Sequence, residues 1–180
     1  MAVLGGADCE QIGSGWLAQP ANAVSSLVFV GVGLWLLWCA HVSSSRRGAL
    51  AAAGGAMVGV GIGSFAFHGP QPSWANTAHD VSIVVLAAVI VTDHAWLFVR
   101  RREGRAAALL RASRKAAPLM VLALAAYWAG RTASAVCRPA SLWQYHAAWH
   151  ALSAVALGLF AAAHVTIDSR HYRHPGWPRP

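Results

Sequence analysis

The stretch ANAVSSLVFVGVGLWLLWCAH, residues 21–41, decides the class of fold because it contains no Asp, Glu, Lys or Arg. A helix needs about 20 apolar residues to cross the hydrocarbon core of a bilayer, and this stretch is long enough. Further apolar stretches follow along the chain, at about 49–68, 78–99, 118–132 (short unless it also takes in 106–110) and 145–167. The sequence therefore predicts an all-α, polytopic transmembrane helical bundle with about five spans.

Composition supports this class and excludes others. Of 180 residues, 57% are hydrophobic and 11% are charged, whereas a soluble domain carries about 25% charged residues. This apolar content excludes a disordered chain, and three cysteines are too few for a disulfide-dense mini-protein. The net charge of +8 does not indicate nucleic acid, because the basic residues separate apolar stretches. We expect a single integral membrane domain over residues 1–180.

The basic residues predict the orientation of that domain. Twelve of the fourteen follow the first, third or fifth apolar stretch, and the other two are Arg131 and Arg138. Cytoplasmic loops are enriched in Lys and Arg. The N-terminal segment 1–20 is therefore expected outside a bacterial-type inner or plasma membrane, and the tail 168–180 in the cytoplasm. Residues 1–6 lack the basic start of a signal peptide.

Three histidines are expected near one depth at the outer side. His146 and His150 are four residues apart, so a helix presents both on one face. His68 ends the second stretch and would complete a three-nitrogen site with one open position, as in catalytic zinc centres. Interfacial polar histidines are the plainer alternative. Haem is a rival ligand, but paired haem ligands need to face each other from different helices.

Two further polar residues are candidates for catalysis. Asp80 is one of only six acidic residues, and it could act as general base and then as acid at a metal-bound water. Its alternative role is a helix N-cap. Ser64 lies one turn before His68 and could stabilise an oxyanion, or it could simply allow close helix packing. The active site would then face the outer side.

The cysteines divide by side of the membrane. Cys9 and Cys137 are both expected outside, where a disulfide can persist, although spacing alone does not fix their pairing. Cys39 lies near the inner end of the first stretch and is expected to be a free, packed thiol.

Three motifs in order resemble the alkaline ceramidase family, part of a wider superfamily of membrane hydrolases that includes adiponectin-receptor-like proteins. They are Asp8-Cys9-Glu10 with Asn22-Ala23-Val24-Ser25-Ser26, then Gly63-Ser64-Phe65-Ala66-Phe67-His68, and then Gln144-Tyr145-His146-Ala147-Ala148-Trp149-His150. The resemblance extends from Asp8 to about His164. The chain differs from the family in the number of spans, because about five are expected here and the family typically has seven.

The resemblance implies a set of roles. Zinc would bind His68, His146 and His150, while Asp80 and Ser64 would assist amide hydrolysis. Cys9 and Cys137 would form the family's disulfide. The family's calcium site would retain only Asp8 and Glu10, because Ala7, Ile12 and Gln19 replace expected ligands. The interval from His68 to Asp80 is one residue longer than usual, so His79 competes for the place of Asp80.

The expected function is therefore zinc-dependent intramembrane hydrolysis of the amide bond of ceramide or a related N-acyl lipid. The partners would be the bilayer and the lipid substrate, which would enter laterally from the outer leaflet. The alternative is a non-catalytic membrane receptor or scaffold with a structural metal site, and a haem-binding electron carrier is a third hypothesis.

Overall fold

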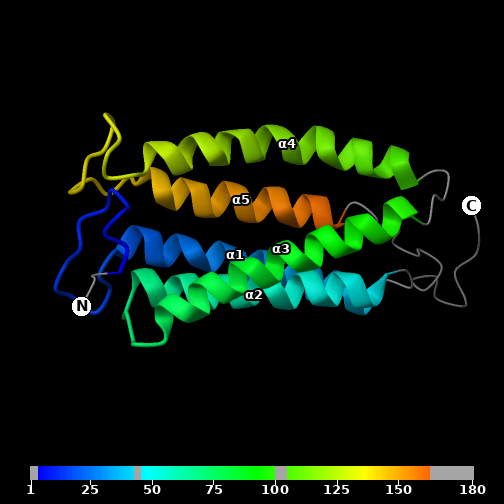
Figure 1. Ribbon diagram of the computed structural model, residues 1–180, viewed down its shortest axis with the longest axis horizontal. Helices are drawn as coiled ribbons and strands as arrows, with labels where there is room; N and C mark the ends of the chain where they lie inside the picture. The colour runs from blue at the N-terminus through cyan, green and yellow to red at the C-terminus, as the bar shows by residue number, and fades with distance from the viewer. Residues whose placement is uncertain (1–3, 43–45, 100–104, 163–180) are drawn as a thin grey trace, which may run out of the picture.

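The computed structural model of the protein describes residues 4–42, 46–99 and 105–162. Within these ranges the regular structure is entirely helical, which confirms the all-α prediction. Five helices lie side by side along the long axis of the molecule (Figure 1). They are α1 (Pro20–Val42), α2 (Arg47–His68), α3 (Ala75–Val99), α4 (Arg105–Ala129) and α5 (Tyr145–Ala161).

Three of these helices are long and apolar enough to cross a membrane. They are α1, α2 and the first part of α3, from Ala75 to Asp93. Large apolar side chains on their outward surfaces are exposed, among them Leu34, Trp38 and Val84. Apolar side chains that face outward from a long helix are expected where lipid surrounds it. The structure therefore supports a membrane protein.

The fourth helix begins earlier than the apolar pattern suggests. It starts at Arg105 rather than near Pro118. Two basic residues that were expected in a loop therefore lie within α4, namely Arg114 and Lys115. Ala, Leu, Arg and Lys are the strongest helix formers, and the helix continues through Pro118. The helix thus includes residues 106–110, which the short fourth stretch would have to take in to reach full length. The end of the fifth predicted stretch, 163–167, and the tail 168–180 lie outside the described residues.

The helices pack as a bundle that is closed on one side and open on the other. The main contacts are α1 with α2, α2 with α3, α1 with α5, and α4 with α5. Within the described residues, α3 has at most marginal contacts with α4 and α5. The core between the closely packed helices contains Phe29, Leu36, Met57, Val60 and Ala154. One side of α3 is therefore left free to border a cavity.

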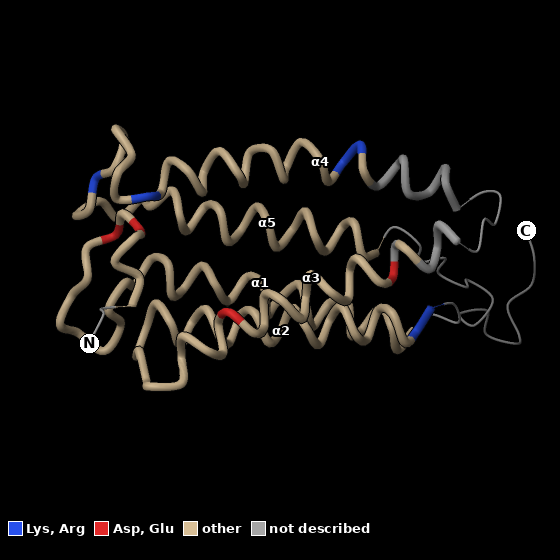
Figure 2. Tube along the Cα trace, viewed as in Figure 1, with Lys and Arg blue, Asp and Glu red and all other residues tan. Residues whose placement is uncertain are grey.

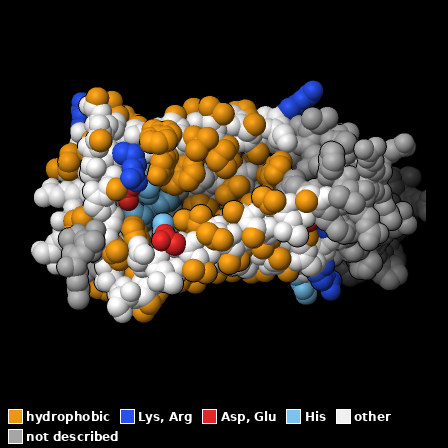
Figure 3. Space-filling model, in the orientation of Figure 1, with side chains coloured by type: hydrophobic (Ala, Val, Ile, Leu, Met, Phe, Trp, Pro, Cys, Tyr) orange, Lys and Arg blue, Asp and Glu red, His pale blue; other side chains and the backbone are white. Residues whose placement is uncertain are grey.

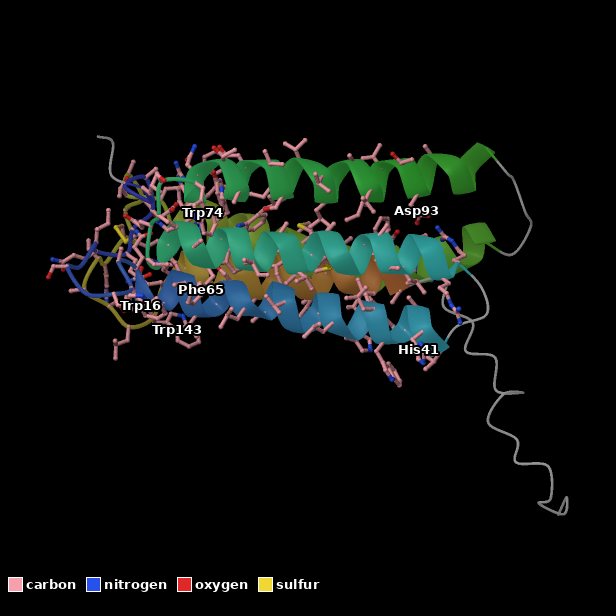
Figure 4. All side chains as sticks on the ribbon, turned by 90° about the horizontal axis from the view of Figure 1, so that it is seen from below. Trp16, His41, Phe65, Trp74, Asp93 and Trp143 are labelled. Carbon is pink, nitrogen blue, oxygen red and sulfur yellow. A yellow bond between two sulfur atoms is a disulfide. The ribbon has the colours of Figure 1, made fainter. Side chains whose placement is uncertain are left out.

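Charged residues gather near the two ends of the bundle, and few lie between (Figure 2). At the end shared by the start of α2 and the end of α3, Arg46 forms an ion pair with Asp93. At the opposite end lie Trp16, Trp74 and Trp143 (Figure 4), each more than half exposed. Tryptophan is enriched at both membrane–water interfaces, so these side chains are suited to such a boundary.

Candidate metal centre

Three buried histidines from two helices meet near the Trp-bearing end of the bundle. His68 is the last residue of α2, and His146 and His150 occupy successive turns at the start of α5. Their ring centroids are 5.2 Å (His68 to each of the other two) and 4.7 Å (His146 to His150) apart. One nitrogen of each ring lies within 4.8 Å of the others. The three predicted ligands are therefore brought together with spacing suited to a metal ion.

A glycine allows the end of α4 to approach the start of α5, which carries two of the three histidines. A Cβ atom at Gly130, at the end of α4, would lie 2.6 Å from the His146 backbone nitrogen and 2.9 Å from its Cα. Such contacts are too short for any larger residue, so Gly130 lets the chain pass directly against the start of α5. The backbone of His146 is therefore packed directly against the end of α4.

The hydrogen bonds around the rings define which nitrogen faces the centre. His68 Nδ1 donates to Gln19 Oε1 at 2.7 Å, and His150 Nδ1 donates to the Asn22 carbonyl at 3.1 Å. A carbonyl oxygen can only accept, so both rings carry the proton on Nδ1 and leave Nε2 as the ligand atom. His68 Nε2 is buried without a hydrogen-bond partner. A buried ring nitrogen without a hydrogen-bond partner is available as a metal ligand.

Asp8 and Glu10, the two residues that remain of the family's calcium site, have separate partners. Glu10 accepts hydrogen bonds from the backbone nitrogens of Ala21 and Asn22 at 2.7 and 2.8 Å and so caps α1. Asp8 Oδ1 lies 3.1 Å from Arg131 Nη1. Neither carboxylate belongs to a group of three or more potential ligands among the described residues.

Asp8 instead lies beside the histidine cluster. Its Oδ1 is 3.3 Å from His146 Nδ1, a contact within ion-pair range but without the alignment of a hydrogen bond. Burial raises the pKa of Asp8 to about 6, against the opposing effect of Arg131. The sequence alone does not connect Asp8 with this centre, because nothing in the spacing of residues links it to His146.

Ser64 lies at the cluster as expected. Its side chain is 2% exposed, and its Oγ is 3.5 Å from His150 Nε2. The Ser26 hydroxyl donates to Ser64 Oγ at 2.9 Å. The single proton of Ser26 is also within reach of the Asn22 carbonyl at 2.8 Å, and the nearest unprotonated acceptor for the Ser64 hydroxyl is His150 Nε2.

Asp80 lies outside the cluster. Its side chain is 64% exposed, and its Oδ1 is 2.8 Å from His79 Nδ1. His79 is the residue that faces inward: its ring stacks on Phe67 at 4.5 Å and lies edge-on to His68 at 6.3 Å. Neighbouring residues of a helix point about 100° apart, which explains why only one of this pair can face the site.

The expected disulfide and free thiol are both present. Cys9 and Cys137 are bonded, and Cys39 is free and buried. Next to the disulfide, the Cys9 backbone nitrogen donates to the Gly130 carbonyl at 2.7 Å. The N-terminal segment is therefore fixed against the end of α4, beside the histidine cluster.

A cavity of about 900 Å³ extends from the histidine cluster along the free side of α3. Its polar end includes Ser64, His68, His79, Arg131, His146 and His150. Its remaining wall is largely apolar and includes Phe29, Ile83, Leu86, Ile90 and Leu157. Figure 3 shows histidine side chains in a hollow from which apolar side chains extend along the bundle. Two further residues near the end of α4 line the cavity, Tyr127 and Arg131. Neither was expected at the site from the sequence alone.

No family model matches the chain, and neither the curated proteins nor the solved structures contain a match.

Proposed function

We propose that the protein is a zinc-dependent membrane hydrolase that cleaves the amide bond of a ceramide-like N-acyl lipid. The observation that carries this proposal is the histidine cluster in the wall of a large, mainly apolar cavity. A structural zinc site is closed by four protein ligands, whereas a catalytic one has three and leaves a position for water or substrate. The cluster supplies three.

The donor set suits zinc. Three imidazole nitrogens are the ligands of many catalytic zinc sites, and outer hydrogen bonds from the second ring nitrogen hold such ligands in place. His68 and His150 each have such a bond. When bound, zinc supplies a Lewis acid for the substrate carbonyl and lowers the pKa of a coordinated water.

Ser64 is suited to stabilise the charge that develops on the carbonyl oxygen. Its hydroxyl lies 2.9 Å from Ser26 Oγ and 3.5 Å from His150 Nε2, and it would donate to the substrate once a metal occupies that nitrogen. Its position beside His150 Nε2 keeps that proton near the reacting group. One such donor contributes a factor of about 10²–10³ to kcat in well-studied enzymes.

His79, supported by Asp80, is suited to transfer protons. A proton on His79 Nδ1 donates to the Asp80 carboxylate, so Nε2 is left as the basic nitrogen. His79 lines the cavity and could accept a proton from water and return it to the leaving amine. Under this proposal Asp80 acts through His79, which revises the direct role that the sequence suggested.

The cavity supports a lipid as substrate. Its apolar wall along α3 and α5 suits an acyl chain, while the polar end suits an amide and a head group. The opening beside α3 would admit a lipid laterally from the surrounding leaflet. The resemblance of the three sequence motifs to alkaline ceramidases points to the same class of substrate.

We also propose that all five helices span the membrane, with the N-terminus outside and the C-terminus in the cytoplasm. The unequal distribution of basic residues supports this orientation. The proposal puts the histidine cluster near the outer interface, close to Trp16, Trp74 and Trp143.

The test uses the full chain purified in detergent, with zinc measured by mass spectrometry and hydrolysis of a fluorescent ceramide followed by chromatography. Wild type is expected to contain about one zinc per chain and to release the fatty acid. His146→Ala should lose both zinc and turnover. His41→Ala, at the exposed far end of α1, serves as the matched control and should retain both.

Two results would overturn the proposal. Absence of zinc from wild type would remove the metal centre. Bound zinc without turnover of any N-acyl lipid would instead favour a receptor or scaffold with a structural metal.

A further inference from the structure

The outer contacts of all three histidines come from one short part of the chain. Gln19 contacts His68, the Asn22 carbonyl contacts His150, and Asp8 contacts His146. We call Asp8, Gln19 and the Asn22 carbonyl the N-terminal shell. The histidines themselves belong to α2 and α5, so this shell connects helices that otherwise share few contacts.

We propose that Gln19 and Asp8 are positioning residues of the metal centre, with Gln19 orienting the His68 ring through a hydrogen bond and Asp8 acting on the His146 ring through its charge at 3.3 Å. This inference rests on the metal site of the proposed function. It adds that the affinity for metal depends on the N-terminal segment as well as on the three ligands. Loss of an outer partner typically costs 10–100-fold in metal affinity.

Gln19 has no freedom to turn away from His68. Its side chain is 0% exposed, and its Nε2 donates to the Gly5 carbonyl at 3.1 Å and to the Glu10 carbonyl at 2.9 Å. Because both amide protons are used, Oε1 must face His68 Nδ1, at 2.7 Å. The amide therefore fixes both the ring orientation and the tautomer of His68.

Asp8 is held equally firmly. Its carboxylate lies against Arg131, and the flanking backbone is tied to the end of α4 because Thr132 N donates to the Ala7 carbonyl at 3.1 Å. The adjacent Cys9 is bonded to Cys137. A buried carboxylate beside a ligating imidazole raises the basicity of that ligand, and its negative charge also favours a bound cation.

The N-terminal shell is not a second metal site. Its amide group donates where a cation would need oxygen ligands, and Glu10 is occupied by the start of α1. Its chemistry is therefore that of an outer layer around the histidines.

Two substitutions of Gln19 separate positioning from a purely structural role. Gln19→Glu keeps an acceptor for His68 Nδ1 but loses both amide donors to Gly5 and Glu10. Gln19→Met keeps the volume but loses the acceptor as well. If Gln19 merely held the segment together, both variants would weaken zinc binding alike. A positioning role predicts that Gln19→Glu retains zinc affinity within a fewfold, whereas Gln19→Met loses 10–100-fold.

Gln71→Met is the matched control. Gln71 also ties the N-terminal segment to α2, since its Nε2 donates to the carbonyls of Leu4 and Phe67, but it contacts no histidine ring in these bonds. Zinc affinity of each full-length variant is measured by competition with a chromogenic chelator, and thermal unfolding reports on folding. Gln71→Met should bind zinc as tightly as wild type.

The variant Asp8→Ala provides an independent test, because it removes the contact with His146 and leaves Gln19 in place. It should also lower zinc affinity at least tenfold. Equal zinc affinity in wild type, Gln19→Met and Asp8→Ala would overturn the inference while leaving the zinc site intact. Failure of wild type itself to bind zinc would instead overturn the proposed function.

Discussion

The Ser26 hydroxyl on α1 donates a 2.9 Å hydrogen bond to the Ser64 hydroxyl on α2. Both side chains are almost completely buried, and Ser64 also lies 3.5 Å from His150. This hydrogen bond helps to fix the orientation of the Ser64 hydroxyl group. Two residues 38 positions apart in the chain thereby act as one hydrogen-bonding unit at the histidine cluster.

Removal of the Ser64 hydroxyl should slow turnover without loss of metal. Ser64→Ala is expected to lower kcat by about 10²–10³-fold, the cost of one oxyanion donor, and Ser26→Ala should have a smaller effect in the same direction. Both variants should keep one zinc per chain. Thr92→Ala, on the exposed surface near the far end of α3, is the control. Loss of zinc from Ser64→Ala would show that the hydroxyl supports the site and not the reaction.

His79 and Asp80 should differ in how much they contribute to turnover. His79→Ala is expected to lower kcat by about 10²–10⁴-fold, the usual contribution of a general acid or base. Asp80→Asn should cost less, because His79 remains in the cavity wall while only its outer partner changes. Single-turnover rates with fluorescent ceramide distinguish the two. The reverse order, with Asp80→Asn inactive and His79→Ala active, would restore Asp80 as the direct base.

The disulfide should support the metal centre as well as the fold. Replacement of both Cys9 and Cys137 by Ser is expected to reduce stability by about 2–4 kcal/mol, as for typical disulfides, and to weaken zinc binding because Asp8 adjoins Cys9. Cys39→Ser, a change at the free buried thiol, controls for the loss of a sulfur atom. The measurements are the midpoint of thermal unfolding and the zinc content after dialysis. If the double variant keeps the zinc content of wild type, the disulfide does not support the metal centre.

Turnover should not require calcium. The carboxylate of Glu10 is used by the start of α1, and the Asp8 carboxylate pairs with Arg131, so few oxygen atoms remain for a cation that takes six to eight. A calcium-selective chelator should leave the rate of hydrolysis unchanged, whereas a zinc chelator should abolish it. A rate that falls with the calcium chelator and returns with added calcium would contradict this reading.

A larger side chain in the cavity wall should change which acyl chains are accepted. Ala87 lines the cavity, whereas its neighbour Ala88 is absent from the cavity wall. Ala87→Phe is expected to raise KM for long acyl chains more than for short ones, because it takes up part of the apolar volume. Ala88→Phe, on the same helix, is the matched control. Identical chain-length profiles for both variants and wild type would show that the acyl chain does not bind there.

The sequence predicted those features that depend on composition and local spacing. Uncharged apolar stretches indicated the helices, and the four-residue interval between His146 and His150 indicated a shared helix face. The meeting of His68 with that pair followed from expected membrane depth, and the structure confirms it. The two outer cysteines were also identified and are bonded.

Features that depend on side-chain direction or on distant contacts could not be predicted. Whether His79 or Asp80 faces inward depends on the rotation of α3, which a nearly uniform apolar helix does not reveal. Asp8, Gln19 and Arg131 reach the site through loop contacts between residues more than 40 positions apart. The start of α4 was left open between 106–110 and Pro118, because the residues before Pro118 combine good helix formers with several charges.

Since α3 packs chiefly on α2, the distance between His79 and the histidine cluster depends on how far α3 tilts away from α2. The contact between α2 and α3 is close at Gly63, where a Cβ atom would lie 2.9 Å from the Ala78 carbonyl. This close contact lies at one end of α3. Spanning helices adjust their tilt to the hydrophobic thickness of the bilayer. The surrounding lipid is thus expected to act on the reaction twice, as its substrate and as the medium that sets the geometry of its active site.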